Sequence, residues 1–180
     1  MGRIYMNIEI TPIFSSPIGH FSDIEIDCNV LLKEVQNIPF YTCGAEHLGP
    51  SDRGYFISHE HHLLEKFPKE KSYFLNLFTI YKNDYLHYHN TEFKMTTSWG
   101  TCAIPGDYPH SIPHCHKNNM FSAVYYLDNG EKNISPLIFK SFGIGPSTSS
   151  FHIKPTQHTV LNATEWIINA SPGDFVVFPS

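Results

Sequence analysis

The sequence predicts one mainly β domain with helices at its N-terminal end, built as a β-sandwich or a jelly roll. At 180 residues the chain is long enough to bury its own core and too short for two full domains. Apolar residues recur at helical spacing in its first half, whereas short alternating runs separated by Gly- and Pro-rich turns fill its second half. We therefore expect a single domain over 1–180, with helical support over about 1–92 and barrel strands over about 93–180.

The N-terminal segment predicts short strands and then a short helix. "IEITPIF" and "IGHFSDIEID" alternate like strands and are interrupted by Pro12 and Pro17. "DCNVLLKEVQNI" predicts a helix capped by Asp27 or Asn29. The apolar side of that helix would be formed by Val30, Leu31, Val35 and Ile38. The next segment, "TCGAEHLGPSDRG", has the composition of a loop.

A long amphipathic helix is predicted over 67–88, with Pro68 in its first turn. Its apolar residues at helical spacing are Phe74, Leu77, Phe78, Tyr81, Tyr85 and Tyr88. After it the period changes to that of strands. The expected strands lie in "FKMTTSWGTCAI", "FSAVYYLD", "PLIFKSF", "SFHIKPT", "EWIINA" and "DFVVFPS".

Composition and charge exclude several classes of partner. The formal net charge of −5 leaves no basic surface for nucleic acid or an anionic membrane, so a small molecule or a peptide is the expected substrate. The N-terminus lacks a signal-peptide pattern and no run of 18 apolar residues occurs, which predicts a cytoplasmic protein. The four cysteines show no CxxC spacing and are expected to be reduced thiols.

Five of the twelve histidines have a structural explanation. "SHEHHLLEKF" does not contain HExxH, so His59, His61 and His62 are expected at the start of a helix. His87 and His89 would end the long helix, where an imidazolium complements the helix dipole.

His114 and His116 have the spacing of a metal site. In a strand, residues i and i+2 project from the same face, so both imidazoles can bind one ion while a third ligand comes from a distant strand. Imidazole suits iron, copper, nickel and zinc alike, so this pair alone does not select the metal. The alternative is an ordinary pair of loop histidines. His110, in the loop before the strand, could support the site or have no role in it.

The segment "SWGTCAIPGDYPHSIPHCHKNNMFSAVYYL" resembles a family of 2-oxoglutarate- and iron(II)-dependent oxygenases related to prolyl hydroxylases. In that family a Ser-Trp strand, a Gly-Asp turn, H-x-H-x-N and S-G-x-Y-Y-L follow in this order. The matching residues are Ser98, Trp99, Gly106, Asp107, His114, His116, Asn118, Ser122, Tyr125, Tyr126 and Leu127. "SPGDFVVFPS" is similar to the family's C-terminal motif through Pro172, Gly173, Phe178, Pro179 and Ser180.

The resemblance implies a double-stranded β-helix, which is a cupin-like jelly roll, holding Fe(II) and using 2-oxoglutarate and O2 to hydroxylate an unactivated C–H bond. His114 and His116 would be metal ligands. Most of the wider superfamily has Asp or Glu at the position of His116, but members of this family are similar to the present sequence at this position. The resemblance therefore implies a three-imidazole site, and a carboxylate from elsewhere in place of His116 is the alternative. In the family a distal histidine and a basic residue follow Phe-Pro-Ser. We therefore expect the third ligand and the last barrel strand after Ser180.

Four further residues are candidates for cosubstrate binding. Alternation places Ser122 and Tyr126 on one face of "FSAVYYL", where their hydroxyls could bind 2-oxoglutarate or simply pack in the core. Trp99 could form a wall of the pocket or belong to the core. Lys140 could bind a carboxylate if it faces inward, or be solvated if it faces outward.

Two other functions stay open from the sequence. One is a catalytically incomplete jelly-roll or cupin-like module that binds a ligand or partner without a metal. The other is a cupin-type enzyme that holds zinc or nickel, since imidazole ligands do not exclude these ions.

Overall fold

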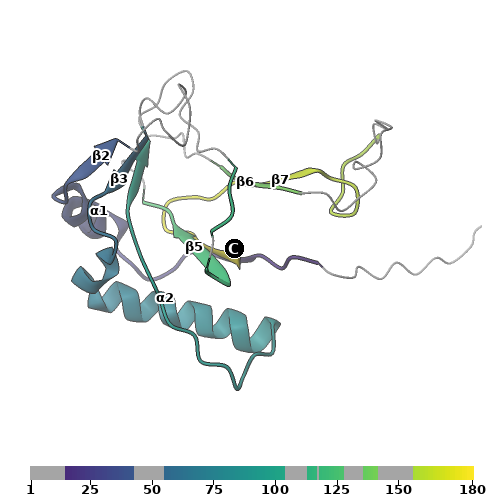
Figure 1. Cartoon of the computed structure of the whole chain (residues 1–180), viewed down its shortest axis with the longest axis horizontal. Helices are drawn as coiled ribbons and strands as arrows, with labels where there is room; N and C mark the ends of the chain where they lie inside the picture. Colours follow the sequence, from purple (N-terminus) through teal and green to yellow (C-terminus); the bar gives the residue numbers. More distant parts are fainter. Residues whose placement is uncertain (1–14, 43–54, 104–112, 117, 128–135, 142–155) are drawn as a thin grey trace, which may run out of the picture.

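A computed structural model describes residues 15–42, 55–103, 113–116, 118–127, 136–141 and 156–180. Within these ranges the chain is rich in β-structure and has few helices, as the sequence predicted (Figure 1). The strands are β1 (Gly19–Phe21), β2 (Phe40–Thr42), β3 (Tyr55–Ser58), β4 (Thr101–Ala103), β5 (Phe121–Tyr125), β6 (Leu137–Lys140), β7 (Glu165–Ile168) and β8 (Phe175–Pro179). The helices are α1 (Cys28–Gln36), α2 (Pro68–Ile80), the short 3-10 helix η2 (Leu63–Lys66) and the π-helix η3 (Tyr81–Tyr85).

The central sheet has the order β1-β8-β5, with β8 antiparallel to both neighbours. Val177 lies opposite Gly19 on one side and Ala123 on the other. Val176 and Val177 are fully buried. The C-terminal run "DFVVF" therefore forms the best covered strand, as expected for an apolar segment with a neighbour at each edge.

Helix α2 lies along one face of this sheet (Figure 1). The ring of Phe74 stacks on Phe175 with centroids 5.1 Å apart. Tyr81 is almost fully buried and donates a hydrogen bond from its hydroxyl to the carbonyl of Pro17 over 2.8 Å. A Cβ on Gly19 would lie 2.7 Å from the Tyr81 ring, so only glycine allows β1 to approach η3 this closely.

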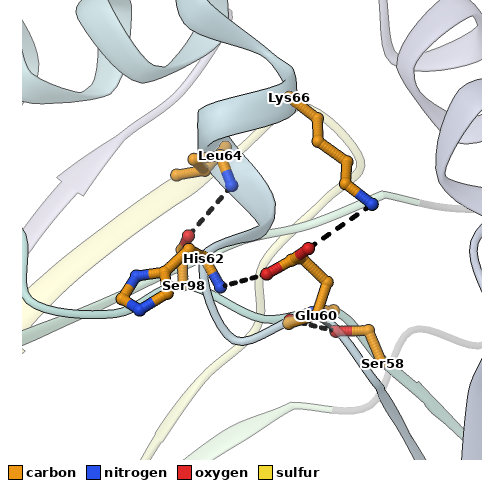
Figure 2. A network of polar contacts seen from close by, with 7 residues as sticks. Ser58, Glu60, His62, Leu64, Lys66 and Ser98 are labelled. Carbon is orange, nitrogen blue, oxygen red and sulfur yellow. Dashed lines mark hydrogen bonds and ion pairs between the residues drawn. The ribbon is translucent and has the colours of Figure 1, made fainter.

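A second sheet has the order β2-β3-β4, and Ser98 and Trp99 lie in the segment just before β4. Ser98 joins this segment to η2, because its hydroxyl accepts a 2.9 Å hydrogen bond from the amide of Leu64 (Figure 2). Its carbonyl also accepts a 2.8 Å hydrogen bond from the amide of Leu63. Beside it, Glu60 accepts from the amide of His62 and pairs with Lys66 at 3.5 Å (Figure 2). Ser98 thus caps η2 from a position that is distant in the sequence.

Ser98→Ala is expected to lower the free energy of unfolding by about 1–2 kcal/mol, because the half-buried amide of Leu64 loses its acceptor. Urea unfolding measures this loss. Ser72→Ala, at an exposed serine of α2, is the matched control. Equal stability of the two variants would show that the Ser98 hydroxyl does not cap η2.

The structure confirms several predicted elements and corrects others. Asp27 caps α1 through 3.0 and 3.1 Å hydrogen bonds from the amides of Asn29 and Val30. Val30 is not on the buried side, however, since it is 54% exposed and Leu31 is the residue that packs inside. Strands β2 and β3 were not predicted.

The long helix ends earlier than expected. α2 stops at Ile80, where the chain widens into η3, so the expectation that His87 and His89 end this helix was wrong. The predicted strand "IEITPIF", most of the loop "TCGAEHLGPSDRG" and most of "SFHIKPT" lie outside the described residues. No described helix is long and apolar enough to cross a bilayer.

Candidate metal centre

His114 and His116 precede β5, and their rings lie together. The centroids are 4.9 Å apart and the planes are nearly perpendicular, at 76°. The Trp99 ring lies 5.5 Å from that of His116. Three residues predicted from the sequence to form the site therefore meet in one place, although Trp99 comes from the segment just before β4. His110 lies outside the described residues.

The surroundings of His116 favour its neutral form. Partial burial lowers the pKa of the His116 imidazole, and the neighbouring His114 lowers it further. Metal binding requires a neutral imidazole, because the proton competes with the ion for the same nitrogen. The direction of this shift suits a metal ligand.

The donor set fits part of an iron site. Two imidazoles are suitable ligands for ferrous iron and would fill two of the three positions of a facial set. In the part of the chain that the structure describes, no third His, Cys, Asp or Glu joins them. Cys115, between the two histidines, is exposed and is a free thiol, like Cys28 and Cys102.

Strand β5 presents two different faces. Phe121 and Tyr125 turn toward α2, where the Phe121 ring lies 5.5 Å from Phe78 and the Tyr125 ring 4.9 Å from Phe74. Ser122, on the opposite face, has its hydroxyl 2.7 Å from that of Ser180. Ser122 thus projects away from the helix, and Tyr126 follows the last residue of β5.

Tyr126 lies next to an ion pair that the sequence analysis missed. The amide of Tyr126 donates to the carbonyl of Asp174 over 3.0 Å. The buried Asp174 carboxylate accepts from the amide of Ser171 at 2.7 Å and lies 2.9 Å from Nε2 of His20. The sequence signal was the "SPGD" turn, in which an aspartate commonly binds nearby backbone amides.

These surroundings predict a specific loss of stability at high pH. Burial, together with the negative charge of Asp174, raises the pKa of the Tyr126 phenol to about 12. The unfolded chain loses this proton near pH 10, so the contribution to stability is complete below pH 10 and lost as the pH rises toward 12. Tyr126→Phe is therefore expected to flatten the fall in stability over this interval.

Urea midpoints measured from pH 8 to pH 11.5 would test this effect. Tyr85→Phe is the control, because Tyr85 is 70% exposed. If Tyr126→Phe follows the wild-type curve, the Tyr126 phenol does not carry the alkaline transition.

Lys140 lies on the ribbon formed by β6 and β7. It is directly opposite Glu165 in the register, and its ammonium is 2.9 Å from that carboxylate. Both side chains are more than 40% exposed. The ammonium of Lys140 is therefore already paired with a carboxylate of the same chain.

The sequence around these residues matches a known family. Residues 97–180 match the family model described as "Putative 2OG-Fe(II) oxygenase". Over this segment the chain is similar to that oxygenase family. The segment contains both histidines, Trp99, Ser122, Tyr126 and Lys140, together with strands β4 to β8.

The family match supports an oxygenase at the level of the family, and the family name implies Fe(II) and 2-oxoglutarate. No curated protein and no solved structure matches the chain significantly.

Proposed function

We propose that the protein is a non-haem iron(II), 2-oxoglutarate-dependent dioxygenase that hydroxylates an unactivated C–H bond of a small molecule or a peptide. The observation that carries the proposal is the close pair of His114 and His116 within the segment that matches the oxygenase family. Two adjacent imidazoles on one short segment are the start of the facial ligand set that such enzymes use.

The arrangement of the strands supports a double-stranded β-helix as the frame of this site. β6 and β7 form a separate two-stranded sheet that contacts the face of the central sheet turned away from α2. The contact is made by Phe139, whose ring lies 5.0 Å from that of Phe178. In this proposal the jelly roll would hold the metal in its interior, and Ser122 and Tyr126 would face it.

Each candidate residue has a defined task. His114 and His116 would hold Fe(II), which together with bound 2-oxoglutarate supplies the activation of O2. Trp99, beside His116, would exclude water from one side of the metal. The neutral phenol of Tyr126 can donate a hydrogen bond to a carboxylate of the cosubstrate, and the Ser122 hydroxyl can do the same. Lys140 would bind such a carboxylate only by releasing Glu165.

The test is an anaerobic titration of the protein with Fe(II) and 2-oxoglutarate. A visible charge-transfer band that requires both components is expected, because the keto acid must chelate the metal for the band to form. On admission of air, succinate should form. A folded protein that binds Fe(II) but gives no band would contradict the proposal.

A second function is a jelly-roll module that binds a ligand without metal. The donor set favours this second function, because no third ligand joins His114 and His116 among the described residues. It predicts that neither Fe(II) nor zinc binds above the level of the double variant His114→Ala/His116→Ala. Tight binding of zinc or nickel, with no 2-oxoglutarate band, would instead indicate a cupin-type enzyme.

A further inference from the structure

Lys82 is a buried cation that faces no anion. It is 8% exposed, and its ammonium donates to Oδ1 of Asn83 over 2.6 Å and to the carbonyl of Tyr88 over 3.0 Å. Among the described residues no carboxylate lies within ion-pair distance of it, and its third proton has no acceptor. Neutral acceptors satisfy hydrogen bonds but leave the buried charge uncompensated, which is costly.

The backbone around Lys82 has two unusual features. Lys82 lies in the π-helix η3, and π-helical turns are often found at functional sites. Five residues later, His87 adopts φ +57°, in the left-handed region that is uncommon for residues other than glycine. The amide of Tyr88 then donates to the carbonyl of Lys82 over 2.8 Å. Both the backbone carbonyl and the ammonium of Lys82 thus bind the backbone of Tyr88, which fixes the turn that contains it.

This turn forms one wall of a surface hollow of about 430 Å³ that Lys82 also lines. Asn90 and Thr91 also line the hollow, whereas the Thr79 hydroxyl already donates to the carbonyl of Leu75 over 2.8 Å. An ammonium surrounded by hydroxyl and amide donors matches the oxygens of a carboxylate. Glu92 also lines the hollow and would repel a second negative charge.

We propose that this hollow binds a small monoanionic carboxylate, with Lys82 as its counter-ion. The hollow is formed by residues 79–93, outside the segment that matches the oxygenase family. None of the residues that line it is a proposed metal ligand. The bound carboxylate would supply the charge that Lys82 lacks and the acceptor for its third proton.

The experiment is an NMR titration of the ¹⁵N-labelled full chain with sodium acetate, at ionic strength held constant with chloride. Saturable shifts of the amides of Lys82, Asn90, Thr91 and Glu92 are expected. Acetamide, the neutral analogue, should not change the chemical shifts of these amides. Phosphate should bind no more tightly than acetate, because Glu92 opposes a dianion.

Three variants decide the assignment. Lys82→Met is expected to weaken acetate binding about tenfold or more. Glu92→Gln should strengthen it about threefold, which keeps the test decisive if Lys82→Met does not fold. Lys69→Met, at an exposed lysine of α2, controls for the change in net charge.

The proposal is overturned if acetate and acetamide give the same shifts, or if phosphate binds more tightly than acetate. It is also overturned if Lys82→Met binds acetate like wild type, or if Glu92→Gln gains no affinity. Because the titration uses no metal, a failure of the oxygenase assignment would leave its outcome unchanged.

Discussion

His114→Ala is expected to abolish the 2-oxoglutarate charge-transfer band and to weaken Fe(II) binding by more than about 100-fold, since loss of groups that only orient a ligand already costs 10–100-fold. The pair supplies the only clustered imidazoles at this site in the described ranges, so each one carries a large share of the affinity. His116→Ala should have the same effect.

Trp99 provides a second readout that does not depend on turnover. Its ring lies 5.5 Å from that of His116, so Fe(II) bound there should quench its fluorescence. Trp166→Phe leaves Trp99 as the single tryptophan of the sequence, which assigns the signal. In that background, His114→Ala is expected to remove most of the quenching.

The matched control uses the other close pair of imidazoles, His87 and His89, whose ring centroids are 5.8 Å apart. His87→Asn removes one imidazole of that pair, and asparagine tolerates the φ of +57° at this position. It should leave the band and the quenching unchanged. If His87→Asn loses the band while His114→Ala keeps it, the metal is bound near α2 and our assignment is wrong.

Phe74→Ala is expected to cause the largest loss of stability, about 3–5 kcal/mol. Phe74 is 4% exposed and contacts both Phe175 of β8 and Tyr125 of β5, so its removal leaves a cavity between α2 and the central sheet. For a chain of this size each kcal/mol corresponds to about 2–4 °C in melting temperature.

Denaturant unfolding and thermal melting measure this loss. Tyr85→Ala removes an aromatic side chain that is 70% exposed and should change stability by no more than about 0.5 kcal/mol. If Phe74→Ala does not fold, Phe74→Leu should fold with a smaller loss. Stability equal to that of Tyr85→Ala would mean that α2 does not hold the central sheet.

The parts of the fold that follow local rules were predictable from the sequence. Asp27 caps α1 because a short polar side chain before an apolar run satisfies the first amides of a helix. Strands β5 to β8 fall within the alternating runs because their side chains face two different environments. β2 has only three residues and depends on pairing with β3, so its sequence carries too little periodicity to reveal it.

The site was predictable to the same extent. The HxH spacing and the family resemblance made His114 and His116 candidate ligands, whereas the contact of His116 with Trp99 depends on tertiary structure that no spacing shows. The pair of His20 and Asp174 joins residues 154 positions apart, and the pairing of Lys140 with Glu165 depends on the register of two strands. Such partners are set by topology, which local patterns do not encode.

The position of β8 between β1 and β5 also constrains how the chain folds during synthesis. β1 emerges from the ribosome early, but its neighbour in the sheet is made more than 150 residues later, as the separation of His20 and Asp174 shows. Until then the aromatic face of α2, with Phe74 and Tyr81, has no sheet to cover it. Pairings of such long range form slowly, so the nascent protein passes through an aggregation-prone stage in which a chaperone has apolar surface to bind.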